Sequence, residues 1–558
     1  MCRLLPFLIL QWRLLMSETI TALTAFRAID ILNQRRSGHR SSNKFVSTMY
    51  ENAEDEVINS DTNSEVDVET HFMEQPLDHF NTTALPADVS AVLYQRYFYS
   101  SRFVRNTMED ATIRPHLAFL CVGGEGPAMD ESVLVDSVHC TGDMIELARF
   151  MYDSQGASVH LYALEHRYYG NSYPSFINTS TQEQISPITN SNLQWLSSRQ
   201  AQFDLRDFVI EQNKNNHHAH SHTWITFGGS YPGMMAAWAR KLHPQIIHAA
   251  VSSSAPIAIT LDFGGYLDQV AWDLQYSRVG GSSQCLQLVM EGHAELASAL
   301  LQDAGRHDEI AALFDLCDVS SLQDPKNVAM WLGDGVIMVP AQSNDPMGTD
   351  ATSSIAVLCD KLLGVPDASP MQALATVARE QNNGMCVTID WIATLNSISD
   401  TSMNATEEDG IRSWLWQTCT EFGFYQTCEA ESICPFGRGY HEIDWDLEIC
   451  ERCFGIPKEQ VAKNVNESLL FYGGYNLDVS RILSVNGDVD PWAVLALTKD
   501  TSQDLPTHWV YGASHHYWTH PVQPYDDYNI QNARALIYLQ VMKWLKEVDD
   551  GLLLTVPI

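Results

Sequence analysis

Residues 228–233 (GGSYPG) place a serine among glycines, where an apolar run gives way to a helix-like segment. A serine on a sharp turn between a strand and a helix projects its hydroxyl above a sheet, and small neighbours relieve crowding around it. The G-x-S-x-G pattern is not met literally, because Pro232 stands where its second glycine is expected. Proline is tolerated in the first turn of a helix, whose N–H groups have no intrahelical partner. The segment predicts either a nucleophile at Ser230 or a purely structural turn.

Two later segments supply the other side chains that a serine nucleophile requires, namely a base and a carboxylate that orients it. Residues 486–492 (NGDVDPW) follow one apolar run, and residues 512–516 (GASHH) follow the next. The order serine, acid, histidine is that of α/β-hydrolases. We therefore predict that Ser230 is the nucleophile, Asp490 the acid and His515 the base. The alternative is that Asp-Pro and Gly-Asp form ordinary turns and that the histidines belong to a polar loop.

Two backbone N–H groups are needed to stabilise the oxyanion of an acyl-transfer reaction. We expect one from Tyr231, the residue after the nucleophile, and the other from Gly124. Gly124 lies in residues 123–127 (GGEGP), a glycine-rich segment that also fits a simple tight turn. It lacks the G-x-G-x-x-G spacing of nucleotide-binding loops, so we expect no cofactor.

Histidines and cysteines form two further clusters that resemble metal sites. Residues 217–222 (HHAHSH) follow a polar run and are interpreted as a polar loop, so we expect no metal there. Cys450 and Cys453 have C-x-x-C spacing, but a zinc ribbon requires a second such pair and none follows. We interpret the cysteines of residues 419–453 as disulfide partners, with their pairing left open.

The elements that must position these side chains follow from the hydrophobic pattern. Short apolar runs alternate with helix-like segments between residues 90 and 260, which predicts a parallel sheet of β-α-β units. Helical periodicity dominates residues 261–470, and strand character returns afterwards. The predicted strands are 116–122, 159–165, 223–227, 249–254, 481–485 and 507–511, and an amphipathic helix is predicted near 532–546.

These elements predict an α/β protein with the α/β-hydrolase fold and a large inserted helical cap. We expect the first part of the hydrolase domain at 71–260, a cap with clustered cysteines at 261–470, and the second part at 471–558. The large separation between the serine and the acid fits a cap inserted before the acid.

The first 70 residues differ in composition from the rest. Residues 1–45 begin with a basic residue and a short apolar run, the pattern of a secretory signal, with a disordered leader as the alternative. Residues 46–70 are acidic and predict a disordered, solvated linker. Four N-x-S/T sequons and twelve cysteines indicate an oxidising route. The predicted glycosylation sites are Asn81, Asn178, Asn404 and Asn466.

Acidic residues outnumber basic ones, with 69 Asp and Glu against 33 Lys and Arg and a formal net charge of −36. Binding a phosphate backbone requires positive surface, so nucleic acid is excluded as the main partner. No stretch reaches about 18 uninterrupted apolar residues, so we expect no stable membrane insertion. The acidity either aids solubility alone or suits an acidic compartment, where protonated carboxylates repel one another less.

Nine segments, in order along the chain, resemble one family of serine peptidases, the lysosomal Pro-X carboxypeptidase and dipeptidyl peptidase II family, which includes thymus-specific serine protease. They are 71–81 (HFMEQPLDHFN), 95–99 (QRYFY), 123–127 (GGEGP), 164–170 (LEHRYYG), 196–208 (LSSRQAQFDLRDF), 228–238 (GGSYPGMMAAW), 419–424 (CTEFGF), 486–492 (NGDVDPW) and 512–516 (GASHH).

The resemblance implies a glycosylated secretory or lysosomal enzyme that cleaves next to proline. It implies that the first histidine of the pair, His515, is catalytic, with His516 as the second candidate. Met234 and Trp492 match positions of an apolar proline-binding pocket, with ordinary core packing as the alternative. Pro232, together with the Tyr-Trp pair that follows the histidines, departs from the lysosomal members and resembles the thymus-type branch.

The function expected from the sequence is that of a serine exopeptidase acting through an acyl-enzyme, secreted or lysosomal, with peptides as substrates. Whether residues leave from the amino or the carboxyl end stays open, and so does a homodimer. An esterase or lipase on the same fold is one alternative, and a catalytically silent binding protein is another.

Overall fold

The computed structural model describes residues 68–80, 85–105, 116–215, 222–403, 410–502 and 504–548. The leader at 1–45 and almost all of the acidic segment at 46–70 lie outside these residues. The first strand, β1 (Val68–Gln75), begins three residues before the boundary expected at residue 71. Its backbone pairs with β2 (Val89–Phe103) from Val68 onward.

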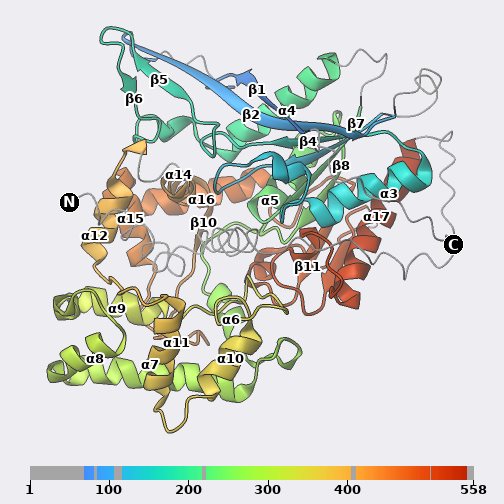
Figure 1. Ribbon diagram of the computed structural model, residues 1–558. Helices are drawn as coiled ribbons and strands as arrows, with labels where there is room; N and C mark the ends of the chain where they lie inside the picture. The colour runs from blue at the N-terminus through green and yellow to red at the C-terminus, as the bar shows by residue number, and fades with distance from the viewer. Residues whose placement is uncertain are drawn as a thin grey trace.

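A ten-stranded mixed sheet runs through the molecule, in the order β12-β11-β8-β7-β3-β4-β2-β5-β6, with β1 paired to β2 (Figure 1). Its six strands from β12 to β4 are parallel to one another, and β2 is antiparallel to β4. The remaining strands are β3 (Leu117–Val122), β4 (Val159–Leu164), β5 (Ser175–Asn178), β6 (Gln184–Ile185), β7 (Thr223–Gly229), β8 (Ile247–Ser253), β11 (Ile482–Gly487) and β12 (Thr507–Val510).

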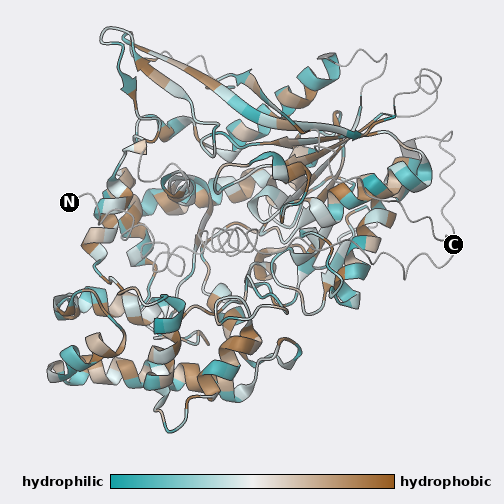
Figure 2. Ribbon diagram, viewed as in Figure 1, coloured by the Kyte–Doolittle hydropathy of each residue, from teal (hydrophilic) through white to brown (hydrophobic). Residues whose placement is uncertain are grey.

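Helices cover both faces of the sheet, as a parallel sheet requires. One face packs against α4 (Ser198–Asn215) and α5 (Tyr231–Leu242), and the other against α3 (Glu146–Gln155) and α17 (Tyr528–Val548). The strand β3 shows why: alternate residues belong to the two apolar clusters on either side of the sheet. Figure 2 shows hydrophilic and hydrophobic residues interspersed along α3 and α17, as expected of helices with one face on the core.

The chain leaves the sheet after β8 and returns at β11, and the intervening segment is mainly helical, as predicted for the cap. Its helices are α6 (Gly265–Gln275), α7 (Ser283–Gln302), α8 (His307–Leu313), α9 (Pro325–Asp334), α10 (Ile355–Leu363), α11 (Pro370–Gln381), α12 (Trp391–Ser399), α14 (Ile411–Gln417), α15 (Asp444–Phe454) and α16 (Lys458–Tyr472). The helices α6 to α11 lie at the lower left of Figure 1, away from the sheet, whereas α12 and α14 to α16 lie at the middle left, nearer to it. A small parallel pair, β9 (Thr260–Asp262) with β10 (Gly423–Tyr425), was not expected from the sequence.

Disulfides cross-link the described residues within the sheet domain and within the cap. The five pairs are Cys121–Cys140, Cys285–Cys359, Cys317–Cys386, Cys419–Cys450 and Cys428–Cys434. Cys450 of the C-x-x-C sequence pairs with Cys419, whereas Cys453 is a buried free thiol. The prediction of disulfides therefore holds for four of the five clustered cysteines and is wrong for Cys453.

Candidate active site

Ser230 occupies a strained turn between the last residue of β7 and the first residue of α5. Its φ of 64° and ψ of −133° lie outside the regions that a residue with a side chain normally adopts. A Cβ atom on Gly228 would lie 2.3 Å from the carbonyl oxygen of Pro232, and one on Gly233 would lie 2.8 Å from that of Ser253. Only glycine fits these two positions without a clash, so the local sequence permits the sharp turn that presents the serine.

The segments predicted to supply the acid and the base end at the same edge of the sheet as Ser230. Asp490 follows β11 and His515 follows β12, and both strands run parallel to β7 in the same sheet. The carboxyl ends of parallel strands meet at one edge, where α/β proteins bind their ligands. A Cβ atom on Gly229 would lie 2.7 Å from the ring of His516, so the histidine pair lies directly beside the turn of the serine.

His515 and Asp490 form a buried pair with the geometry of a base and its orienting acid. The Nδ1 atom of His515 lies 2.8 Å from Oδ1 of Asp490, which also accepts the backbone N–H of Trp492 at 3.0 Å. Asp490 is fully buried and His515 is 5% exposed. With Nδ1 engaged by the carboxylate, Nε2 is the nitrogen available to accept a proton.

His515 Nε2 is buried and has no hydrogen-bond partner among the described residues, and none of the hydrogen bonds within that part of the chain joins it to Ser230 Oγ. In free hydrolases this bond is often long, and it tightens when substrate binds. Among the described residues, no other group therefore occupies the nitrogen that would accept the proton of Ser230.

The second histidine has different partners. Nδ1 of His516 lies 3.1 Å from the hydroxyl of Thr519, and its backbone N–H donates to Ser254 Oγ. Burial, followed by the neighbouring His515, holds the pKa of His516 well below its usual value. A neutral imidazole bound to a hydroxyl lacks the carboxylate that orients a general base, so the geometry favours His515 over His516.

The glycine-rich loop after β3 packs against the serine turn, as expected for an oxyanion loop. A Cβ atom on Gly124 would lie 2.5 Å from Pro232 and 3.2 Å from the ring of Tyr231. The backbone N–H of Tyr231 belongs to the first turn of α5, where N–H groups have no intrahelical acceptor. Gly124 and Tyr231 are therefore close enough in the fold to present their N–H groups to one site.

An aromatic cluster centred on Trp492 lies beside His515 and includes rings from both the sheet domain and the cap. Trp492 lies next to His515, with ring centroids 6.2 Å apart, and its ring also contacts Phe263, Tyr266 and Phe424 at 5.4 to 5.6 Å. Such a set of flat apolar surfaces suits a pyrrolidine ring. Trp492 and Met234 both belong to the buried apolar cluster of this face, which fits ordinary packing as well as a binding pocket.

Gln342, a cap residue that no sequence pattern singles out, holds these groups together. Gln342 accepts hydrogen bonds at its side-chain oxygen from the indole N–H of Trp492 at 2.8 Å and the hydroxyl of Tyr266 at 3.0 Å. Its backbone carbonyl accepts the N–H of His515 at 3.1 Å. The cap is thus tied by hydrogen bonds to the base itself.

A second buried network connects the nucleophile turn to the cap through the side chain of Tyr231. Its hydroxyl lies 2.9 Å from Nε2 of His166 and accepts an N–H of Gln417 at 3.1 Å. Gln417, at the end of α14, also accepts the hydroxyl of Tyr169 at 2.7 Å. Burial lowers the pKa of His166 to about 4, so this imidazole is neutral in the network.

A cavity lies beside the oxyanion loop and the nucleophile turn. Its lining includes Gly124, Glu125, Pro232 and His516. Burial raises the pKa of Glu125 to about 7, and its Oε2 atom is buried without a hydrogen-bond partner in the described part of the chain. Below neutral pH this carboxyl is therefore neutral and can donate a proton in a hydrogen bond. No pattern in the sequence points to a role for Glu125, although it lies within the GGEGP segment.

The remaining predicted sites lie on the surface or outside the described residues. Asn81, Asn404, His217, His218 and His220 fall outside them. Asn178 ends β5, and Asn466 is exposed on α16, so both stay predictions of glycosylation. In the described portion of the chain, every helix is too short or too polar to cross a bilayer.

Comparisons with known proteins agree with this geometry. The sequence pattern of the family described as Serine carboxypeptidase S28 matches residues 75–537. The chain is 32% identical over 494 residues to thymus-specific serine protease of Mus musculus, covering 86% of this chain and 88% of that protein. It is 24% identical over 418 residues to lysosomal Pro-X carboxypeptidase of Homo sapiens, covering 72% and 78% of the two chains.

Among solved structures, the peroxisomal α/β-hydrolase Lpx1 of Saccharomyces cerevisiae is similar. It covers 88% of this chain and 93% of its own at 9% identity and a TM-score of 0.35. The fold is that of an α/β-hydrolase, as predicted, and the strand order and the turn at Ser230 carry that conclusion rather than the superposition.

Proposed function

Because this chain belongs to the serine carboxypeptidase S28 family, it is a serine exopeptidase, and we propose that Ser230, His515 and Asp490 cleave peptide bonds next to proline. The observation that carries the assignment of the three residues is the 2.8 Å contact between His515 and Asp490, at the sheet edge where the strained Ser230 turn also lies.

In the proposed reaction, Ser230 Oγ attacks the carbonyl carbon of the scissile bond while its proton passes to Nε2 of His515. Asp490 keeps the imidazole in the required tautomer and stabilises the imidazolium. The N–H groups of Tyr231 and Gly124 stabilise the oxyanion. The imidazolium then protonates the leaving amine, the C–N bond breaks, and an ester to Ser230 remains. Water, deprotonated by His515, hydrolyses that ester and restores the serine.

The aromatic rings around Trp492 support a preference for proline. Phe263, Tyr266 and Phe424 offer flat apolar surfaces around Trp492, whose ring lies beside His515. The proline ring is compact and apolar and lacks an N–H to satisfy. The Pro-X carboxypeptidase relative lends further support to this substrate class. The family description favours removal of residues from the carboxyl end.

Product mapping on a peptide library tests the substrate. We expect cleavage near one chain end, enriched for proline beside the scissile bond, in peptides with a free terminus. Blocking the carboxyl or the amino end in separate pools shows which end is required. Cleavage of simple esters without cleavage of any peptide would contradict the proposal and favour the esterase interpretation.

Labelling with a fluorophosphonate probe tests the nucleophile. The wild type and the control Ser277→Ala, an exposed serine of the cap, are expected to react equally, whereas Ser230→Ala is expected not to react. Equal labelling of Ser230→Ala, or failure of the wild type to react, would refute the assignment.

We also propose that the enzyme travels through the secretory pathway to the lysosome or the cell exterior. The five disulfides, the four sequons and the lysosomal relative support this route. Removal of N-linked glycans from protein made in animal cells is expected to increase its electrophoretic mobility.

A further inference from the structure

Three histidines gather at the amino edge of the sheet, opposite the edge that carries Ser230. His116 directly precedes β3, His160 is the second residue of β4, and His222 directly precedes β7. In the sheet, β3 lies between β4 and β7, and all three strands are parallel. The three side chains therefore come from neighbouring strand starts, although they are far apart in the sequence.

The strand register places the three imidazoles on one face. His160 pairs with Ala118, which lies two residues after His116 and so shares its face. Thr223 pairs with Leu117, and its N–H donates to the carbonyl of His116 at 2.9 Å, which puts His222 beside His116.

The rings are close enough to share one ion. One nitrogen from each imidazole lies within 4.8 Å of those of the other two. A zinc ion bound at 2.0–2.1 Å in tetrahedral geometry needs nitrogens about 3.4 Å apart, and small rotations about the side-chain bonds close that gap without moving the strands. Because His160 and His222 stack at 4.5 Å between ring centroids, these rotations must also tilt the two rings toward a common point.

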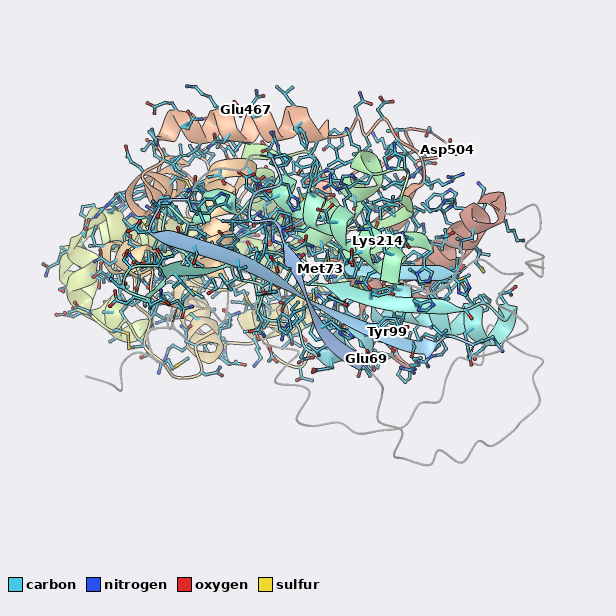
Figure 3. All side chains as sticks on the ribbon, turned by 90° about the horizontal axis from the view of Figure 1, so that it is seen from above. Glu69, Met73, Tyr99, Lys214, Glu467 and Asp504 are labelled. Atoms are coloured by element: carbon cyan, nitrogen blue, oxygen red, sulfur yellow. A yellow bond between two sulfur atoms is a disulfide. The ribbon has the colours of Figure 1, made fainter. Side chains whose placement is uncertain are left out.

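The surroundings fit a metal site in one further way. The hydroxyl of Tyr99 lies 2.9 Å from Nδ1 of His160, which leaves Nε2 to face the other rings, and metal-bound histidines usually engage a second group in this way. Glu69 pairs with Tyr99 on the neighbouring strand (Figure 3), and its carboxylate, which lies 2.8 Å from Nε2 of His71, also acts electrostatically on the Tyr99 hydroxyl. His160 and His222 are buried, and His116 is partly exposed as a residue although both of its ring nitrogens are buried.

We propose that His116, His160 and His222 form a site for one divalent transition metal that prefers imidazole nitrogen, of the class of Zn²⁺ or Cu²⁺. Three neutral imidazoles are a ligand set typical of such ions, and a fourth position would be left to water. The site would tie three strand starts together and so stabilise the folded state. This role is separate from the peptidase reaction, because the site and Ser230 lie at opposite edges of the sheet.

The test uses the full chain, stripped with a chelator and titrated with Zn²⁺. We expect one equivalent to bind with micromolar or tighter affinity and to raise the thermal midpoint by several degrees, because the metal binds the folded state alone. Co²⁺ in place of Zn²⁺ is expected to give the visible absorption of a tetrahedral site. Absence of stoichiometric binding to folded protein would overturn the proposal.

Matched variants locate the ion. His160→Gln and His116→Gln are expected to lose the bound equivalent and the thermal shift. If His160→Gln fails to fold, as judged by circular dichroism, the partly exposed His116→Gln decides. The triple variant His217→Gln, His218→Gln, His220→Gln removes the other histidines of residues 217–222 and keeps His222. It is expected to bind Zn²⁺ as the wild type does. Unchanged binding by His116→Gln, or loss only in the triple variant, would overturn the assignment.

Discussion

The sheet domain and the cap contribute to the active site in different ways. All proposed reacting groups, namely Ser230, Asp490 and His515, follow strands of the sheet, and the serine lies in a strained backbone conformation that its glycine neighbours permit. The cap contributes hydrogen bonds and aromatic rings, through Gln342 and Gln417 among others. The chemistry thus depends on the strand ends of the sheet, whereas the shape of the site depends in part on the cap.

The sharpest way to test this division is to remove the base. We expect His515→Ala to lower kcat by roughly 10⁴-fold or more, because a serine hydroxyl without a base is a poor nucleophile. His516→Ala keeps the pair of His515 and Asp490 and is expected to lower kcat far less. Steady-state kinetics on a proline-containing peptide measures both, and the reverse ranking would assign the base to His516.

The oxyanion loop should give the next largest effect. In Gly124→Ala the added methyl would lie 2.5 Å from Pro232, so the loop must move away from the serine turn. We expect kcat to fall by about 10²- to 10³-fold, the usual cost of losing one oxyanion donor. Gly384→Ala, in the cap, adds a methyl that meets no atom within 4 Å and serves as the control for a glycine substitution away from the site, although its φ of 72° adds backbone strain that Gly124 does not have. An unchanged kcat in Gly124→Ala would remove Gly124 from the oxyanion site.

Glu125 makes the sheet domain sensitive to pH. Burial raises its pKa to about 7 in the folded chain, whereas an unfolded glutamate ionises near 4.5. The folded state therefore binds the proton more tightly than the unfolded state does. The contribution of this proton to the free energy of unfolding is fully present below about pH 4.5 and is lost as pH rises through 7. A difference of about 2.5 pKa units corresponds to roughly 3 kcal/mol.

We expect Glu125→Gln to lose less stability than the wild type between pH 5 and pH 8, measured as the free energy of unfolding in denaturant. The exposed carboxylate variant Asp308→Asn is the control, since its change should leave the pH profile as it is in the wild type. Identical profiles for the wild type and Glu125→Gln would show that Glu125 is ionised in the folded protein throughout this range.

The smallest effect is expected where the cap meets the nucleophile turn. Gln417→Leu leaves the hydroxyls of Tyr231 and Tyr169 without their shared partner, at a cost of about 1–3 kcal/mol in unfolding free energy. We expect kcat/KM to fall by about tenfold, because the reacting groups stay on the sheet. A loss as large as that of His515→Ala would show that the cap takes part in the chemistry.

Local sequence was sufficient to predict the serine turn and the order of its partners. The glycines around Ser230 permit the tight turn, and the strand before Asp490 shows its apolar pattern directly. The helical character of the insertion follows from periodicity in the same way. These features depend on residues adjacent in the chain, and for that reason a single sequence reveals them.

The tertiary structure alone decided which distant side chains meet. The sequence alone does not predict the contacts of Gln342 with Trp492 and of His166 with Tyr231, or the disulfide between Cys121 and Cys140. Histidines 116, 160 and 222 come together because β3 lies between β4 and β7, and strand order is set by the packing of the whole sheet. A residue type and its neighbours determine local conformation, whereas proximity across a sheet depends on the burial of apolar surface by the entire chain.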